Sequence, residues 1–130
     1  MVNPMSTTGQ KKVIIANAFS LQMVSQYEDV LVRIRKIKNI EEIKQLLQSH
    51  PFISAIGHES TARVLSRLLS ISIPTNRVNV TLEPGVVLIV FQLLGGRLPA
   101  GQELTEQQIE NEFIKTGKYE FKLVEILNAQ

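Results

Sequence analysis

The sequence predicts a single α/β domain in which a mixed β-sheet of about five strands is flanked by helices. Two patterns favour this fold class. Short runs of β-branched residues are typical of strands, and they alternate with segments whose apolar residues recur at helical spacing. The chain has 130 residues, of which 44% are hydrophobic, which is enough for one compact core and too little for two.

Five runs have the composition of strands. The fourth is apolar on both faces, as expected for a central strand that is covered on each side. Pro84 and Gly85 predict a hairpin turn that joins it to the third run, because proline presets φ and glycine tolerates positive φ. The charges of the second run, Arg33, Arg35 and Lys36, are typical of a solvated edge strand. The expected strands cover residues 13–16, 30–35, 78–82, 86–93 and 119–127.

Four segments have helical signatures, and side chains that can cap a helix precede three of them. Ser20 can accept a hydrogen bond from an unpaired amide of the first segment. Asn39 with Glu42, and Thr105 with Gln108, fit the capping box. Two of the expected helices cover residues 21–25 and 58–70. The other two lie between Asn39 and Pro51 and between Thr105 and Gly117, where the glycine suits the position after a helix end.

The composition argues against several classes of protein. The chain has no cysteine, so it has neither disulfides nor cysteine-ligated zinc, and two histidines supply little for any other metal site. It has no phosphate-binding loop of the nucleotide triphosphatases and no HExxH motif. A net charge of +2 tolerates an anionic ligand without predicting a nucleic-acid binder.

The polar N-terminal stretch MVNPMSTTGQKK lacks the apolar centre of a signal peptide. The most apolar run, residues 86–91, is too short to cross a bilayer. We therefore expect a flexible tail over residues 1–12, a folded domain over residues 13–130, a cytoplasmic location and no membrane contact.

The stretch AIGHEST contains the first candidate for chemistry. The start of a helix has unpaired amides and attracts phosphate, and Gly57 would let a ligand approach the backbone. Ser60 and Thr61 add hydroxyl donors. An imidazole at His58 could donate a proton to the leaving oxygen of a phosphate ester. The alternative is an ordinary helix start that contains a histidine.

Two arginines favour the phosphate interpretation. Arg77 follows the turn residues Pro74-Thr75-Asn76, and Arg97 lies in a loop after two glycines. The planar guanidinium group suits phosphate oxygens, and ligands of α/β folds bind at strand ends. The other histidine, His50, is interpreted as a helix-terminal residue that interacts with the helix dipole.

Four stretches, IIANAFSLQM, AIGHESTARVLSRL, TNRVNVTLEPGVVLIVFQL and GGRLPAGQELTEQQI, together resemble the viral ring nuclease family. Members of this family are small anti-CRISPR proteins, with cellular relatives, that destroy the cyclic tetra-adenylate messenger of type III CRISPR defence. The resemblance implies a homodimer with the ring bound across its twofold axis, and no metal. We also expect no cofactor, no DNA partner, and action in the host cytoplasm if the source is viral.

The resemblance also implies roles for individual residues. A ribose 2′-hydroxyl attacks the adjacent phosphorus, and His58 protonates the departing 5′-oxygen. Gln22 stands where the family can have asparagine. The resemblance implies ligand contacts at Asn17, Ser20, Arg77 and Arg97, with Gln92 as a further candidate, and places Ser60 and Thr61 on the helix turn beneath the ligand. Gln22 and Gly57 complete the set of predicted ligand-binding residues.

One position departs from the family pattern. Active relatives carry a glutamate in a pattern like RLPEG, whereas this chain has Ala100, which cannot accept a proton. Either a natural variant relies on other groups, or the residue was changed so that the substrate is held in place. Two functions therefore stay open: a metal-independent ring nuclease, and a protein that sequesters cyclic tetra-adenylate with little turnover. A DNA-binding regulator is a third candidate function. It is disfavoured because none of the expected helices has the basic face of a recognition helix.

Overall fold

A computed structural model describes residues 12–95 and 104–130. The predicted tail, residues 1–12, lies outside the described part except for Lys12, which already belongs to the first strand. The strands are β2 (Lys12–Ala16), β3 (Val30–Ile37), β4 (Phe52–Ser54), β5 (Val86–Leu93) and β6 (Tyr119–Ala129). The helices are the 3-10 turn η1 (Leu21–Val24), α1 (Ile40–Ser49), α2 (Glu59–Leu69), α3 (Glu106–Ile109) and the π-helical turn η2 (Glu110–Ile114).

The described strands form one mixed sheet in the order β3-β6-β5-β2-β4. β2 runs parallel to both of its neighbours, whereas β6 runs antiparallel to both of its own. This arrangement confirms the predicted α/β fold class. It also confirms that the charged strand β3 is an edge strand and that β5 is central, with its first six residues buried.

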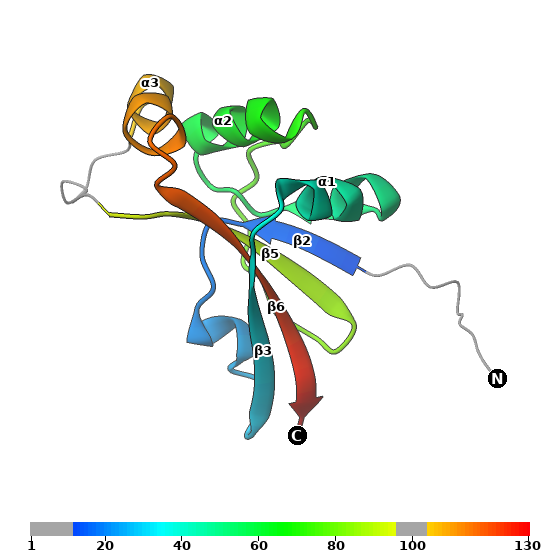
Figure 1. The fold of residues 1–130 in the computed structure, drawn as a ribbon. Coiled ribbons are helices and arrows are strands. Elements are labelled where there is room, and N and C mark those ends of the chain that lie inside the picture. Colours follow the sequence, from blue (N-terminus) through cyan, green and yellow to red (C-terminus); the bar gives the residue numbers. More distant parts are fainter. Residues whose placement is uncertain (1–11, 96–103) are drawn as a thin grey trace.

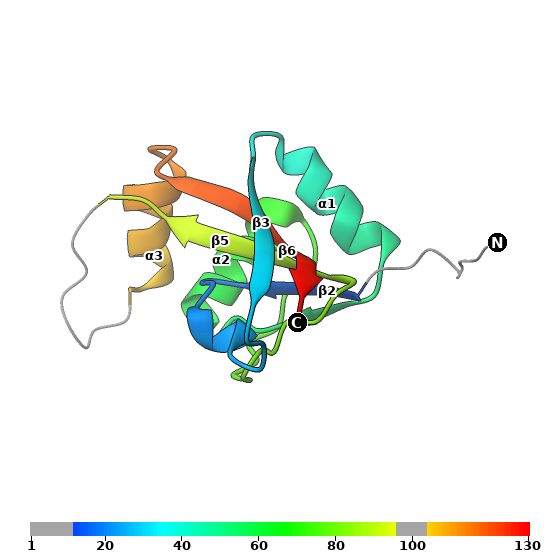
Figure 2. The same ribbon diagram turned by 90° about the horizontal axis from the view of Figure 1, so that it is seen from below.

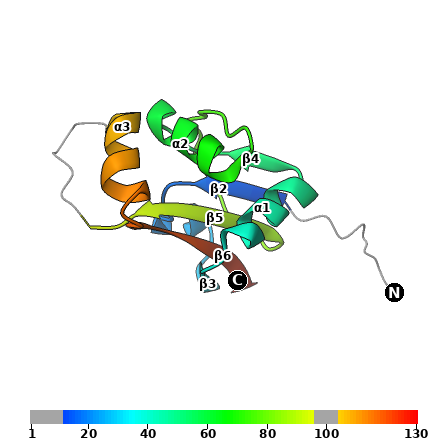
Figure 3. The ribbon, with the colours of Figure 1, turned by 45° about the horizontal axis from the view of Figure 1, so that its top comes forward.

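The sheet is covered differently on its two faces. α1, α2 and α3 lie on one face (Figure 1, Figure 3), whereas η1 lies on the other (Figure 2). The alternation along β2 directs Val13 and Ile15 into the helix-side core and Ile14 and Ala16 into the core on the opposite face. β2 is therefore apolar on both faces, and the chain continues from its carboxyl end to η1.

The predicted strand over residues 78–82 is wrong, because this segment is a loop without regular secondary structure. β5 already pairs with β2 on one side and β6 on the other, so it has no edge left for a hairpin partner. The loop instead docks on η1: the Leu82 N–H donates to Met23 O at 2.8 Å, and the side chains of Gln26 and Tyr27 donate to Leu82 O at 2.7 and 2.9 Å. A tight turn is present at Gly85, whose φ is 90°, and the Val86 N–H donates to Glu83 O at 3.1 Å. It joins no pair of the described strands, so the predicted hairpin is wrong.

The short strand β4 was not predicted. It has three residues and pairs with β2 along one edge, and so short a run shows no alternation that could reveal it.

Two predicted helix starts differ in detail. Ser20 is the residue before η1, but its side chain makes no capping hydrogen bond. Asn39 caps α1 through the Glu41 N–H, whereas Glu42 pairs with Arg35 and does not complete a capping box. The capping box of Thr105 is confirmed, as is Gly117 after the last helix, where its φ is 71°.

Candidate functional site

The carboxyl ends of β2 and β4 meet at a surface hollow of about 460 Å³. Because the two strands are parallel, the residues that follow them lie at the same end of the sheet. Asn17 follows β2, Gly57 and His58 follow β4, and Arg77 enters from the loop before β5. The structure therefore brings four of the predicted site residues together.

A set of hydrogen bonds fixes the segment that leads to His58. The hydroxyl of Ser54, which is 4% exposed, donates to Pro74 O at 2.6 Å and accepts from the Ile56 N–H at 3.2 Å. Asn76 donates from its side chain to Ser54 O at 2.7 Å and from its backbone to Ile56 O at 2.8 Å. These bonds hold residues 54–57 beside residues 74–77. Sequence reasoning missed both Ser54 and Asn76, because neither belongs to a chemical motif.

Arg77 lies against Gly57. Its Nε donates to Gly57 O at 2.7 Å, and a Cβ added at Gly57 would lie 3.4 Å from Arg77 Cγ. The side chain that lies close to Gly57 in the structure is therefore Arg77 of the same chain. His58 is the extended residue before α2, and its side chain makes no capping hydrogen bond.

Ser60 and Thr61 lie outside this hollow. The Ser60 hydroxyl donates to Leu104 O at 2.7 Å, and Thr61 is 9% exposed. Ser60 therefore connects the first turn of α2 to the residue before the capping box of α3. A ligand contact by either residue stays a prediction.

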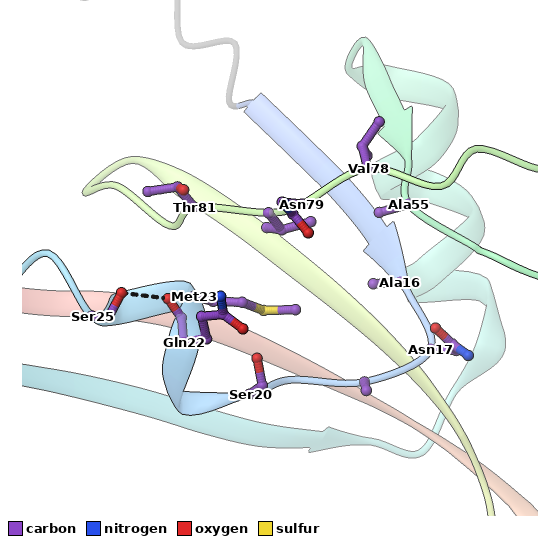
Figure 4. A pocket seen from close by; sticks show the side chains of 12 residues that line it. Ala16, Asn17, Ser20, Gln22, Met23, Ser25, Ala55, Val78, Asn79 and Thr81 are labelled. Carbon is purple, nitrogen blue, oxygen red and sulfur yellow. Dashed lines mark hydrogen bonds between the residues drawn. The ribbon is translucent and has the colours of Figure 1, made fainter.

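A second hollow, of about 390 Å³, adjoins the first (Figure 4). Ser20 and Gln22 line it, and Asn17 and Asn79 line both hollows. Asn79 was not predicted as a site residue. Its spacing from Arg77 was an available signal, since residues two apart in an extended chain face the same side.

A third hollow, of about 240 Å³, is also lined by Asn17, together with Gln92, Phe19 and Lys122. Asn17 thus lines three adjoining hollows. The remaining two predicted site residues, Arg97 and Ala100, lie outside the described residues.

Ion pairs join α2 to α3. Glu106 accepts from Arg67 at 2.8 Å and from Arg63 at 3.3 Å, and the hydrogen bond from Arg67 lowers the pKa of Glu106. Arg63 also pairs with Glu59 at 3.4 Å. The pairs of Glu106 place the start of α3 beside the middle and the last turn of α2.

The described residues include no group of three His, Asp or Glu side chains that could hold a metal ion. Within residues 12–95 and 104–130, no helix has the length and apolar character needed to cross a membrane.

Comparisons with known proteins give this chain viral relatives. A family model described as STIV B116-like matches residues 13–121. The chain is 40% identical over 72 residues to "Uncharacterized protein 26" of Sulfolobus islandicus filamentous virus, covering 55% of this chain and 60% of that protein. It is 42% identical over 73 residues to ORF117 of Acidianus two-tailed virus, covering 54% and 62%. The chain thus spans about three fifths of the length of these curated relatives.

A solved structure has the same fold. B116 of Sulfolobus turreted icosahedral virus superposes with a TM-score of 0.64 at 28% sequence identity, covering 88% of this chain and 98% of that one.

Proposed function

The chain belongs to the STIV B116-like family, and we propose that it is a metal-independent ring nuclease that binds cyclic tetra-adenylate and cleaves it to linear di-adenylate. The observation that carries this proposal is the meeting of Asn17, His58 and Arg77 at one hollow. These residues come from three of the stretches that resemble viral ring nucleases, and the outer two, Asn17 and Arg77, are 77 − 17 = 60 positions apart along the sequence.

The chemistry available at this hollow suits cleavage of a ribonucleotide ring. Arg77 supplies a planar cation for phosphate oxygens, and the unpaired amides at the start of α2 add partial positive charge. A ribose 2′-hydroxyl loses its proton to water as its oxygen forms a bond to phosphorus, and the bond from phosphorus to the 5′-oxygen breaks. His58 donates a proton to that oxygen, and the product ends in a 2′,3′-cyclic phosphate.

The ring is a symmetric ligand, which favours a symmetric site. A twofold dimer presents the same groups to both halves of a ring of identical nucleotides. We therefore propose a homodimer that binds the ring across its axis, with one His58 acting on each half. The reaction would silence type III CRISPR signalling in the cytoplasm of the host.

A second candidate function rests on position 100. A chain with alanine where the family has glutamate could bind the ring and turn it over slowly or not at all. Such a protein would act by sequestering cyclic tetra-adenylate.

One experiment separates these candidates. The protein is incubated with radiolabelled cyclic tetra-adenylate in excess chelator, and the products are resolved by chromatography. Linear di-adenylate with a terminal phosphate is the expected result. Intact ring that stays bound would support sequestration, and the absence of any binding would overturn both functions.

A further inference from the structure

The outer edge of β4 is covered by a loop at its carboxyl end. β4 ends the order of the described strands, with β2 as its neighbour on the inner side (Figure 3). On that side the Ala55 N–H donates to Ile15 O at 2.7 Å. On the other side the carbonyl oxygens of Ser54 and Ile56 accept from Asn76 at 2.7 and 2.8 Å. Asn76 thus occupies an edge that a further strand would otherwise use.

The bonds between β4 and this loop keep one register. Three of them join residues that are 20 positions apart along the chain: Ser54 Oγ to Pro74 O, the Asn76 N–H to Ile56 O, and Arg77 Nε to Gly57 O. Residues 54–57 and 74–77 therefore run in the same direction, as two parallel strands do. Side chains supply two of these three bonds, so the loop follows β4 without a ladder of backbone bonds.

The parallel direction explains why Arg77 reaches the hollow with His58. β2 and β4 are parallel, so Asn17 and His58, which follow them, lie at the same end of the sheet. A loop that runs the same way beside β4 leaves the sheet at that end too. The register then decides which side chain arrives there. A shift of one residue would move Arg77 by about 3.3 Å and turn its side chain to the opposite face.

Asn76 is the residue that fixes this register. It is bonded to β4 through its backbone N–H and through its side-chain amide, and the two carbonyl groups that accept are two residues apart. A shifted loop would lose both bonds, because the short side chain of asparagine cannot follow the shift. The Ser54 hydroxyl supports the same register, since it donates to Pro74 O and accepts from the Ile56 N–H.

These two residues are placed to act through others. Among the described residues, those that line the hollow with His58 do not include Ser54 or Asn76. Ser54 is also 4% exposed, which closes it to a ligand. An effect of either residue on the chemistry would therefore pass through the positions of Arg77 and His58.

We propose that Asn76, supported by Ser54, is a positioning residue of the reaction, because it sets the register that places the Arg77 guanidinium group against the peptide before His58. The inference rests on the proposed function, in which Arg77 holds the phosphate and His58 protonates the leaving oxygen. A displacement of about 1 Å between such groups can lower a rate about 10²-fold. Asn76 therefore affects cleavage more than affinity, since a displaced arginine still attracts phosphate.

The first test needs no ligand. The Nε–H signal of Arg77 is followed by NMR of the ¹⁵N-labelled full chain and is identified by its loss in Arg77→Lys. Asn76→Ala should raise the exchange rate of this hydrogen with water at least about tenfold. Asn76→Asp should do the same, because it has a similar shape without an amide donor. Unchanged exchange in both variants would overturn the positioning role.

Gln26→Ala is the matched control for this test. It removes a side-chain hydrogen bond of the same length, 2.7 Å, to Leu82 O, and neither residue lines the hollow with His58 in the described part of the chain. Exchange at Arg77 should stay at the parental rate in this variant. Equally fast exchange in Gln26→Ala and Asn76→Ala would show a general loosening of the fold and would overturn the proposal.

The second test measures single-turnover cleavage of cyclic tetra-adenylate and affinity for it on the same preparations. Asn76→Ala should lower the rate at least about tenfold and change the affinity less. It should add little to the loss in Arg77→Lys, because both changes remove the same alignment. Losses that add in the double variant would overturn the proposal. If cleavage by the parent is too slow to measure, the comparison is made in the Ala100→Glu background.

A conservative variant covers the case in which Asn76→Ala fails to fold. Ser54→Thr keeps the hydroxyl and suits a strand, so it should retain the parental exchange and rate, whereas Ser54→Ala should lose both. Equal behaviour of the two Ser54 variants would overturn the role of the hydroxyl. If the parent does not bind the ring while Arg77 exchange still responds to Asn76→Ala, the proposed function is wrong and the register set by Asn76 stands.

Discussion

The Nε of Arg77 donates a hydrogen bond of 2.7 Å to the carbonyl oxygen of Gly57, the residue before His58. This bond fixes the plane of the guanidinium group relative to the backbone that carries the histidine. Both residues line the same hollow, so the proposed phosphate clamp and the proposed general acid are connected through one peptide unit. The relationship predicts that cleavage of the ring depends on the geometry of the Arg77 side chain as well as on its charge.

Arg77→Lys should therefore lower single-turnover cleavage of cyclic tetra-adenylate by at least about tenfold. Lysine keeps the charge but has neither the Nε donor nor the planar pair of donors. Arg33→Lys on the edge strand β3 is the matched control and should leave the rate unchanged. An unchanged rate in Arg77→Lys would show that only the positive charge is needed.

His58→Ala should lower cleavage by roughly 10²-fold or more, the scale expected for a positioned general acid. Affinity for the ring should change much less, because the imidazole acts mainly on the leaving oxygen. His50→Ala is the control, since His50 lines a separate hollow with Arg35 and Glu42. Rapid-quench measurement of the single-turnover rate checks this, and near-parental cleavage by His58→Ala would limit His58 to a structural role at the start of α2.

The ion pairs between α2 and α3 predict a pH-dependent stability. Arg67 holds the pKa of Glu106 below its usual value of 4.5. A carboxyl group whose pKa is lower in the folded state stabilises the fold above the unfolded pKa, and this contribution is lost as the pH falls through the folded pKa. Thermal unfolding should therefore shift downward between pH 6 and pH 3, and Glu106→Gln should reduce that shift.

Glu42 and Glu120 also have lowered pKa values, so part of the shift should persist in Glu106→Gln. Glu83→Gln, on the turn before β5, is the control for loss of one carboxylate. A shift of the same size in Glu106→Gln and the parent would show that the α2–α3 ion pairs contribute nothing measurable, as is common for exposed pairs.

Periodicity was sufficient to predict most of the fold. The alternation of β3 and β6, the apolar run of β5 and the capping box before α3 all carry local signals, and the structure confirms each. The failures occurred where pairing partners decide the outcome. Residues 78–82 have the composition of a strand, but the edge of β5 that they would need is occupied by β2. β4 is the opposite case: its sequence has a weak strand pattern, but an edge of β2 is there to pair with it.

The candidate site was predictable only in part for a similar reason. Gly57, His58 and Arg77 belong to motifs, so sequence reasoning found them. Ser54 and Asn76 hold those residues in place through hydrogen bonds across about 20 positions of sequence, and such bonds have no local signature. Ser60 shows a structural role that its position at a helix start does not indicate: its hydroxyl donates to Leu104 O. Its predicted ligand contact stays a prediction.

The last prediction concerns Ala100. If the family glutamate orients the attacking 2′-hydroxyl or accepts its proton, this chain should bind the ring well and cleave it slowly, because loss of one such group commonly costs ~10²–10⁴ in rate. Ala100→Glu should then raise single-turnover cleavage at least about tenfold. Affinity should be unchanged or weaker, since a carboxylate near phosphates adds like-charge repulsion.

Rapid-quench kinetics and equilibrium binding on the same preparation separate the two effects, and Ala100→Gln is the matched control, because it adds similar bulk without a basic oxygen. A faster rate in Ala100→Glu alone would assign the missing step to the carboxylate. Equal rates in the parent, Ala100→Gln and Ala100→Glu would mean that no carboxylate limits the reaction at this position. In that case His58 and the in-line placement of the 2′-oxygen would account for the rate by themselves.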